Sequence, residues 1–325
     1  MLSNFIKRGK MKAKNIFKLI FGLLFVLVIF YYVGFDKIFS AFKNFKLIYL
    51  LAIPPFVFLS YLGGVYSLYI LVRASGFGLG FWNLFKYYLL SLATGMLTPG
   101  RIGEFSMLYF LRKESIPLGQ GAAISFLDKF ISFIAVSITA LVALFVFVIP
   151  KNLILGLVLV LSFVFFVAVF FFFSEKGRYL IRRYLLRSYS IHFEGFSKLL
   201  FFLLKNKPQV LLINFFVSVT KWFSLAFMSY FIFLGLGVYV NPLYIFLITN
   251  FCAVVTLIPI TFNGLGFVEL SILFFYSKLN VPKEVILSQD LIVVPIPYAF
   301  LLLVLVVFIE EFKYVKKVFK EEFKV

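Results

Sequence analysis

The chain has 325 residues, of which 63% are hydrophobic and 14% charged, with a mean hydropathy of +1.07. A soluble fold is excluded, because it could not hide this much apolar surface from water. The net charge of +19 could suggest nucleic acid, but the basic residues flank apolar runs, as topology signals and contacts to anionic lipids do. We therefore expect a polytopic membrane protein that binds no nucleic acid.

Cysteine and histidine are almost absent from the sequence. The single cysteine, Cys252, allows no internal disulfide, and the single histidine, His192, argues against a His-ligated metal site. The sequence motifs of hydrolases, metalloproteases and nucleotide-binding enzymes are also missing. We therefore predict no metal, no other cofactor and no enzymatic activity.

The first part of the chain predicts two membrane spans. A basic segment, 1–18, carries six Lys/Arg and is expected in the cytoplasm. The apolar run from about 19 to 33 ends in bulky residues without a small-residue cleavage site, so it predicts an uncleaved span. A short amphipathic link, 35–46, precedes a second span at about 47–72.

A broken hairpin is predicted between residues 82 and 113. The segment 82–97 looks helical but stops at Pro99, and the helix 102–113 is only about half a bilayer long. The hairpin is therefore expected to enter and leave the membrane on the cytoplasmic side. Irregular backbone at this depth is tolerated only where protein buries it or where it lines a wet cavity.

The rest of the chain predicts four full spans, a basic loop and a second hairpin. The loop, with eight Lys/Arg, is expected in the cytoplasm with an amphipathic helix. The second hairpin is expected to enter from the exterior. The spans are placed at about 122–149, 153–173, 208–236 and 285–309, the loop at 174–207, and the hairpin at 241–257 and 264–277.

These elements predict an all-α polytopic membrane protein with about six full transmembrane helices and two re-entrant broken-helix hairpins. The membrane domain would span residues 19–310, followed by a basic cytoplasmic tail, 311–325. On this tracing 23 Lys/Arg lie inside and 6 outside. This bias supports cytoplasmic termini for a multi-pass protein of the cell membrane.

The two hairpins share a sequence pattern. LTPGRIGEF at 97–105 and LIPITFNGLGFVEL at 257–270 both give Leu-x-Pro, a Gly-rich turn and a glutamate. When Glu104 is aligned with Glu269, the next 13 residues of each also match at Ser, Leu, Phe, Lys and Pro. The shared pattern indicates one unit used twice.

The two units are expected to have opposite directions in the membrane. The first covers about 19–149 and the second about 153–310. The span before the first hairpin runs inward and the span before the second runs outward. We therefore predict a three-plus-three inverted repeat, which is typical of alternating-access transporters.

Several ionisable side chains lie where hydrocarbon is expected. A charge near the bilayer centre costs ~2.5–3.5 kcal/mol, so some gain must offset it. Glu104 could neutralise Arg101 and cap its half-helix, or bind a ligand. Glu269 has no arginine in its turn, so Lys221 is its expected distant partner. The ionisable residues are Arg101, Glu104, Asp128, Lys129, Lys221, Glu269 and Asp290.

These residues predict a midplane site between the N-termini of two half-helices. Free N–H groups in Gly-rich turns favour anions, and Arg101 adds a bidentate fork suited to a phosphodiester. The expected ligand is an anionic lipid headgroup, with the glutamates binding a cation, a proton or a basic group. Alternatively, Lys221 forms only an ion pair, and Asp128 and Lys129 form an interfacial pair that reaches water. The predicted site residues are Gly100, Arg101, Gly103, Glu104, Asp128, Lys129, Lys221, Gly264, Gly266 and Glu269.

LTPGRIGEF, Asp128–Lys129 and IPITFNGLGFVE together resemble the flippase-like transmembrane domain of the lysylphosphatidylglycerol synthase/flippase family, over roughly residues 15–310. The first motif carries the family's Pro-x-Arg-x-Gly-Glu at Pro99, Arg101, Gly103 and Glu104. The second matches at Pro259, Thr261, Gly264, Gly266 and Glu269, with Phe262–Asn263 in place of a frequent Pro-Gly. Lys129 stands where arginine is usual, and these departures bear on headgroup specificity.

The resemblance implies a lipid-translocating domain. Family members that aminoacylate lipids also carry a soluble synthase domain, which this sequence does not include, so no synthesis is expected. The expected substrate is an anionic phospholipid or a polyprenyl-phosphate-linked glycolipid, with membrane lipids as partners. One alternative is a non-transporting membrane partner that presents lipid to a separate glycosyltransferase or lipid-modifying enzyme. The other is a small-solute secondary transporter.

Overall fold

The computed structural model describes residues 13–96, 99–147, 151–180, 183–184, 194–257, 261 and 264–311. Within these ranges the regular secondary structure is helical and contains no strand. The prediction of an all-α polytopic membrane protein is confirmed. The segment 1–12, most of the predicted helix in the loop 174–207 and the tail beyond 311 lie outside the described residues.

The first half of the chain begins with a bent pair of helices. α2 (Ala13–Val33) and α3 (Phe35–Lys43) meet at an angle of 80° at Gly34, whose φ of 99° lies in the left-handed region that favours glycine. The half continues with η1 (Leu47–Ala52), α4 (Ile53–Ala74), α5 (Phe81–Met96), η2 (Pro99–Ser106), α6 (Met107–Lys113) and α7 (Leu118–Val146).

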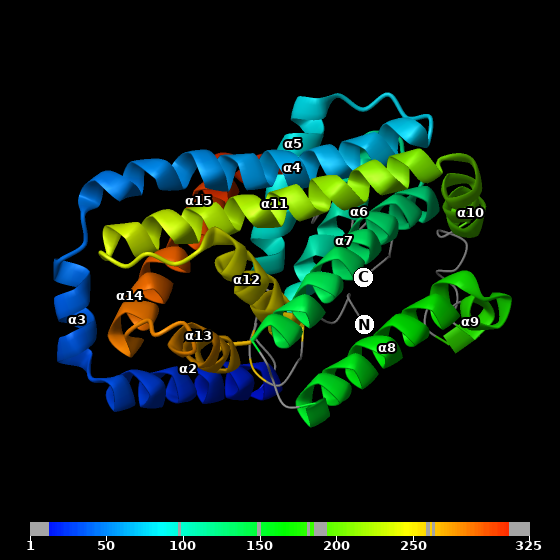
Figure 1. Cartoon of the computed structure of the whole chain (residues 1–325). Helices are drawn as coiled ribbons and strands as arrows, with labels where there is room; N and C mark the ends of the chain where they lie inside the picture. The colour runs from blue at the N-terminus through cyan, green and yellow to red at the C-terminus, as the bar shows by residue number, and fades with distance from the viewer. Residues whose placement is uncertain are drawn as a thin grey trace.

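The second half follows a similar order. It begins with the long helix α8 (Lys151–Phe173), which Figure 1 shows beside α7 near the edge of the molecule. It continues with α9 (Glu175–Leu180), α10 (Phe196–Asn206), α11 (Pro208–Gly235), α12 (Pro242–Leu257), α13 (Phe267–Ser277), α14 (Lys283–Val293) and α15 (Pro295–Val307).

Four runs of helix are long and apolar enough to cross a bilayer, and the bent pair α2–α3 is a fifth candidate. α12 and α13 are shorter apolar helices, as a re-entrant hairpin requires. α8, at the predicted span 153–173, is helical over 23 residues, although several of its side chains are outside the described set. The chain is therefore a multi-pass membrane protein. The four runs are Leu47–Ala74, Leu118–Val146, Pro208–Gly235 and Lys283–Val307.

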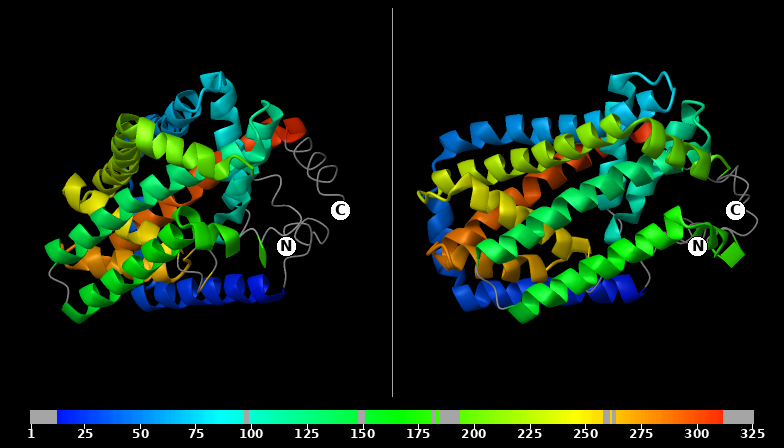
Figure 2. Two further views of the ribbon diagram at one scale, coloured as in Figure 1. Left: turned by 90° about the vertical axis from the view of Figure 1, so that its right-hand side faces the viewer. Right: turned by 45° about the vertical axis from the view of Figure 1, so that its right-hand side comes forward.

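α4 and α11 form the central pair of long helices and lie side by side in both figures (Figures 1 and 2). The N–H of Lys46, before η1 and α4, donates to the carbonyl of Gly235 at the end of α11, at 2.9 Å. Towards the other end, the Asn214 amide donates to the carbonyl of Ser67 at 2.7 Å. The two helices are therefore antiparallel.

Glycine turns recur at equivalent places in the two halves. Gly34 precedes α3 with φ 99°, and Gly195 precedes α10 with φ 83°. Gly76 follows α4 with φ 88°, and Gly237 follows α11 with φ 79°. The members of each pair are 161 residues apart. The chain therefore bends in the same way before and after the central helix of each half.

The turn after each hairpin also recurs. Ser115 and Asn280, 165 residues apart, are the non-glycine residues with positive φ in the described chain, at 62° and 58°. In each turn the next N–H donates to the carbonyl five residues earlier, at 3.1 and 3.2 Å. A proline then caps the following helix, α7 or α14. The spacing of 165 is that of the aligned glutamates Glu104 and Glu269.

An ion pair ties the first hairpin to the end of the last span. Lys86 Nζ on α5 lies 2.8 Å from Glu311 Oε1, and the two side chains are 25% and 23% exposed. The hydrogen bond from Lys86 lowers the pKa of Glu311 below its usual value. Its stabilisation is therefore fully present above the unfolded-state pKa and is lost as pH falls through the lowered folded-state pKa.

Replacing Glu311 by glutamine is expected to have a small, pH-dependent effect. Because the pair is partly exposed, Glu311→Gln should lower the free energy of unfolding by less than about 1 kcal/mol at neutral pH. The difference from wild type should vanish on acidification, which thermal unfolding in detergent at neutral and acidic pH measures. Asp36→Asn, at an exposed position on α3, is the control. A difference that grows as pH falls would contradict the role of this pair.

Candidate functional site

The two arms of the first hairpin pack so closely that Gly103 is required. A Cβ at Gly103 would lie 2.1 Å from the carbonyl oxygen of Thr94 on α5. The hydroxyl of Thr94 lies 2.8 Å from both the Gly103 carbonyl and the Ser106 hydroxyl. The hydroxyl of Ser91, one turn earlier on α5, donates to the carbonyl of Glu104 at 2.7 Å. Small polar side chains of α5 therefore hold the backbone of η2.

The predicted helix 102–113 is only partly correct. The chain forms a 3₁₀ helix, η2, through Ser106, and the α-helix begins at Met107. Glycine disfavours an α-helix, and Gly100 and Gly103 both lie in this segment. The hydroxyls of α5 bind the carbonyls that an α-helix would use, so the tighter turn persists.

Glu104 forms an ion pair with Lys129 of α7, so its charge partner comes from another span. The Glu104 side chain crosses α5 at Gly95, where a Cβ would lie 2.4 Å from Glu104 Cγ. Lys129 Nζ also lies 5.9 Å from the centre of the Tyr88 ring. The Tyr88 hydroxyl in turn rests on Gly64 of α4, where a Cβ would lie 2.1 Å away. Side chains of α5, η2 and α7 therefore converge beside two glycines.

The pair is buried on one side and open on the other. The Glu104 side chain is 13% exposed, whereas that of Lys129 is 50% exposed. Lys129 is nevertheless within a span long and apolar enough to cross the membrane. A cation held there by a carboxylate remains accessible to a ligand.

Asp128 faces away from this pair, into the contact between α4, α7 and α11. Its carboxylate is 2% exposed and accepts hydrogen bonds from Ser67 Oγ at 2.7 Å and Asn214 Nδ2 at 3.2 Å. Lys129, the next residue, turns to Glu104 instead. The alternative of an interfacial Asp128–Lys129 pair is therefore wrong, because the two side chains bind different helices.

Lys221 lies on the polar face of α11 that contacts α4. Its Cβ lies 3.0 Å from the position that a Cβ at Gly63 would take. Asn214 and Ser218 are on the same helical face, because residues at spacings of three and four lie above one another. Both are fully buried. The central helix pair therefore carries polar side chains along its contact.

Glu269 caps its own helix in the second hairpin. Its carboxylate accepts the N–H of Gly266 at 2.6 Å in a capping box, and the residue is 6% exposed. The expectation that Glu269 depends on Lys221 for a partner is therefore wrong. α13 begins at Phe267 rather than Gly264, because φ values of 80° and 86° at Gly264 and Gly266 are not helical.

Helix α2 covers this second turn. A Cβ at Gly266 would lie 2.2 Å from the ring of Phe25 on α2, and that ring packs on Phe267 at 5.6 Å between centroids. α2 also contacts α14, which carries Asp290 near enough to Glu269 for the carboxylates to repel each other. The second turn is therefore enclosed, whereas Lys129 in the first half is half exposed.

Residues 15–304 match the family model described as "Lysylphosphatidylglycerol synthase TM region". The match covers most of the chain. The chain belongs to this family. No match is found among curated proteins. The family's membrane domain is associated with lipid synthase and flippase-like function.

In this family member the predicted site residues fall into two groups. The first hairpin brings Glu104, Gly103 and Gly95 to Lys129, whereas Glu269 closes the second hairpin on Gly266. No hydrogen bond or ion pair between described residues joins the two groups. Gly100 is placed in η2, but the side chain of the predicted phosphate ligand Arg101 is outside the described set.

Sequence reasoning missed three residues of the site. Ser67, Tyr88 and Asn214 are buried and contact the charged groups. Asn214 could have been found, because an amide inside an apolar span needs partners. Ser67 and Tyr88 carry no such signal, since small polar and aromatic residues are frequent in membrane helices.

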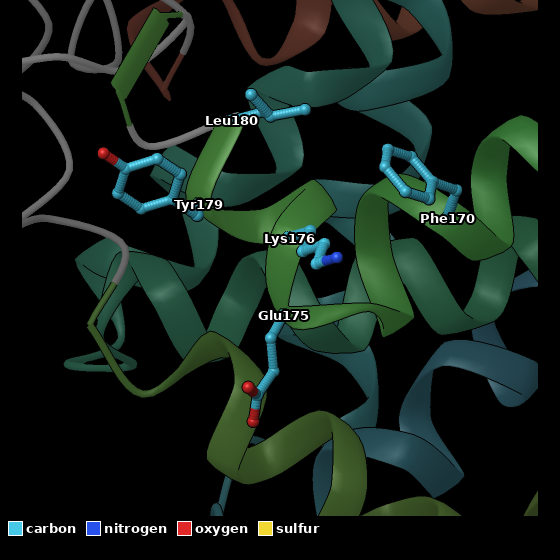
Figure 3. Close-up of a pocket in the computed structure, with 5 residues that line it drawn as sticks. All are labelled: Phe170, Glu175, Lys176, Tyr179 and Leu180. Carbon is cyan, nitrogen blue, oxygen red and sulfur yellow. The ribbon is translucent and has the colours of Figure 1, made fainter.

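A separate hollow lies at the junction of α8 and α9 (Figure 3). Figure 3 shows the charged ends of Glu175 and Lys176 pointing in different directions. The side chains do not converge on a common point, and the residues come from two consecutive helices. We therefore place no function in this hollow. Its lining residues are Phe170, Glu175, Lys176, Tyr179 and Leu180.

Proposed function

We propose that this family member translocates a lipid with a charged headgroup, in a flippase-like manner, at the Glu104–Lys129 pair. The observation that carries the proposal is a half-exposed lysine, paired with a carboxylate, inside a membrane span. A phosphate can compete with Glu104 for Lys129, because charge-assisted hydrogen bonds to phosphate are strong. A hydroxyl or basic group of the same headgroup can bind Glu104.

The two halves are proposed to act as an inverted repeat. Equivalent turns at spacings of 161 and 165 residues and the antiparallel central helices support this arrangement. In such transporters one half rocks against the other around a fixed site. Here the second turn is covered by α2 while Lys129 is half exposed, and we propose that the halves exchange these states.

The substrate is proposed to be an anionic phospholipid or a polyprenyl-phosphate-linked glycolipid. Both present a phosphate next to the membrane surface, which suits Lys129 and the Gly-rich η2. We also propose a cell-membrane location with cytoplasmic termini, in keeping with the distribution of Lys/Arg. The domain itself would catalyse no reaction, and a separate lipid-modifying enzyme would be its functional partner.

The proposal is tested with the purified full chain in liposomes that contain a fluorescent anionic phospholipid or polyprenyl-phosphate lipid. The protein is expected to speed the exposure of inner-leaflet label to an external quencher, relative to empty liposomes. Liposomes with an unrelated multi-pass protein at equal density control for leakiness and bilayer defects. Equal rates with and without protein for both lipid classes would refute translocation and favour the lipid-presenting partner. Uptake of a soluble solute instead would favour a small-solute transporter.

A further inference from the structure

The buried carboxyl group of Asp128 has only neutral hydrogen-bond donors. Ser67 Oγ and Asn214 Nδ2 both donate to the same oxygen, Oδ1. The residue is 2% exposed and is inside the span Leu118–Val146. A carboxylate in such surroundings is costly unless a positive charge or a proton compensates it. The neighbouring cation, Lys129, is hydrogen-bonded to Glu104.

The orientation of the Asn214 amide is fixed by its surroundings. Its Nδ2 lies 2.7 Å from the carbonyl oxygen of Ser67, which can only accept a hydrogen bond. The amide oxygen, Oδ1, must therefore face the other way. It is fully buried and has no hydrogen-bond donor. Such an orphaned acceptor costs about 1–3 kcal/mol, so its presence beside Asp128 needs a reason.

Two further hydroxyls in this region are also without partners. Ser218, one turn beyond Asn214 on α11, is fully buried, and its Oγ forms no hydrogen bond. Ser125, one turn before Asp128 on α7, likewise has a buried Oγ without a partner. α7 and α11 are in contact. A carboxylate, an amide oxygen and two hydroxyls are thus placed along one contact between spans.

We propose that these oxygens form a binding site for a monovalent cation of the Na⁺ type, between α4, α7 and α11. Hard cations take carboxylate, amide and hydroxyl oxygens as ligands. A single carboxylate suits a single positive charge. Asp128 and Asn214 would be the principal ligands, and Ser218 and Ser125 would complete the set.

The proposed cation would act on the lipid site, and this role rests on the function proposed above. A cation at Asp128 would join α4, α7 and α11 and fix the turn of α7 that presents Lys129 to the headgroup. Release of the cation would loosen that turn. The ion gradient would then be a source of energy for translocation.

Cation binding is tested without lipid transport, so its outcome is independent of the flippase assay. The purified full chain in detergent is unfolded thermally in NaCl, KCl or choline chloride at equal ionic strength, and ²²Na⁺ binding is measured directly. Na⁺ is expected to bind saturably and to raise the melting temperature above that in choline chloride, because it binds only the folded state. Asp128→Asn should weaken Na⁺ binding by about 10-fold or more, equivalent to about 1.4 kcal/mol. Asp36→Asn, an exposed carboxyl on α3, should bind as wild type does.

A second variant covers the case in which Asp128→Asn does not fold. Ser218→Ala removes one hydroxyl without altering charge, and it should weaken Na⁺ binding while leaving the melting temperature in choline chloride nearly unchanged. Equal melting temperatures of the wild type in all three salts, with no saturable ²²Na⁺ binding, would overturn the proposal. Unaltered Na⁺ binding in both Asp128→Asn and Ser218→Ala would also overturn it. In either case the buried oxygens would hold water or a proton only.

Discussion

Replacing Lys129 by methionine is expected to slow lipid translocation by about 10- to 100-fold, because a charge-assisted hydrogen bond to phosphate contributes about 1.5–3 kcal/mol. Methionine keeps a long apolar side chain in the half-exposed position while it removes the charge. Glu104 would lose the cation that α7 supplies. The rate of label exposure in liposomes, at matched protein incorporation, measures the effect.

The charge-swapped double variant separates headgroup binding from simple neutralisation. If Glu104 and Lys129 only neutralise each other, Glu104→Lys with Lys129→Glu should restore much of the wild-type rate. If Lys129 binds the phosphate, the swapped pair should stay slow, because the cation then lies on η2 instead of α7. Lys205→Met, at an exposed position on α10, is the matched control and should transport normally. Normal transport by Lys129→Met would remove this pair from the mechanism.

Replacing Gly103 by alanine is expected to destabilise the first hairpin strongly. The new Cβ would lie 2.1 Å from the carbonyl oxygen of Thr94 and 2.8 Å from the N of Gly95, and both atoms belong to backbone that cannot rotate away. Overpacking of this kind costs about 1–3 kcal/mol, and a clash with backbone is at the upper end or beyond. The η2 segment would have to move from α5, and Glu104 would move with it.

A matched glycine is available as the control for Gly103. A Cβ at Gly80, just before α5, would meet no atom within 4 Å, so Gly80→Ala should change stability by less than about 0.5 kcal/mol. Thermal unfolding of both variants in the same detergent measures the difference, and liposome assays show whether translocation falls with it. Equal stability of the two variants would show that the hairpin arms do not pack as described here.

The sequence alone determined the fold class and much of the chain's organisation. Its apolar composition forces a membrane protein, since water could not face that surface. The motifs at Glu104 and Glu269 predicted a repeat, and equivalent turns occur at that spacing at Ser115 and Asn280. The resemblance named the family that the match over residues 15–304 shows. These features are local patterns or properties of the whole chain, and both can be read without tertiary contacts.

Only the tertiary structure decided which charged groups meet. Asp128 and Lys129 are adjacent in the sequence, but successive residues of a helix point about 100° apart, so they bind different neighbours. Lys129 comes to Glu104 because the hairpin packs on α7, and Asn214 comes to Asp128 because α11 crosses α7 from the other half. Glu269 is closed by its own Gly266, through a backbone φ that no residue pattern reports. Partner choice in a membrane bundle depends on helix rotation and crossing, and these are set by packing between segments far apart in the chain.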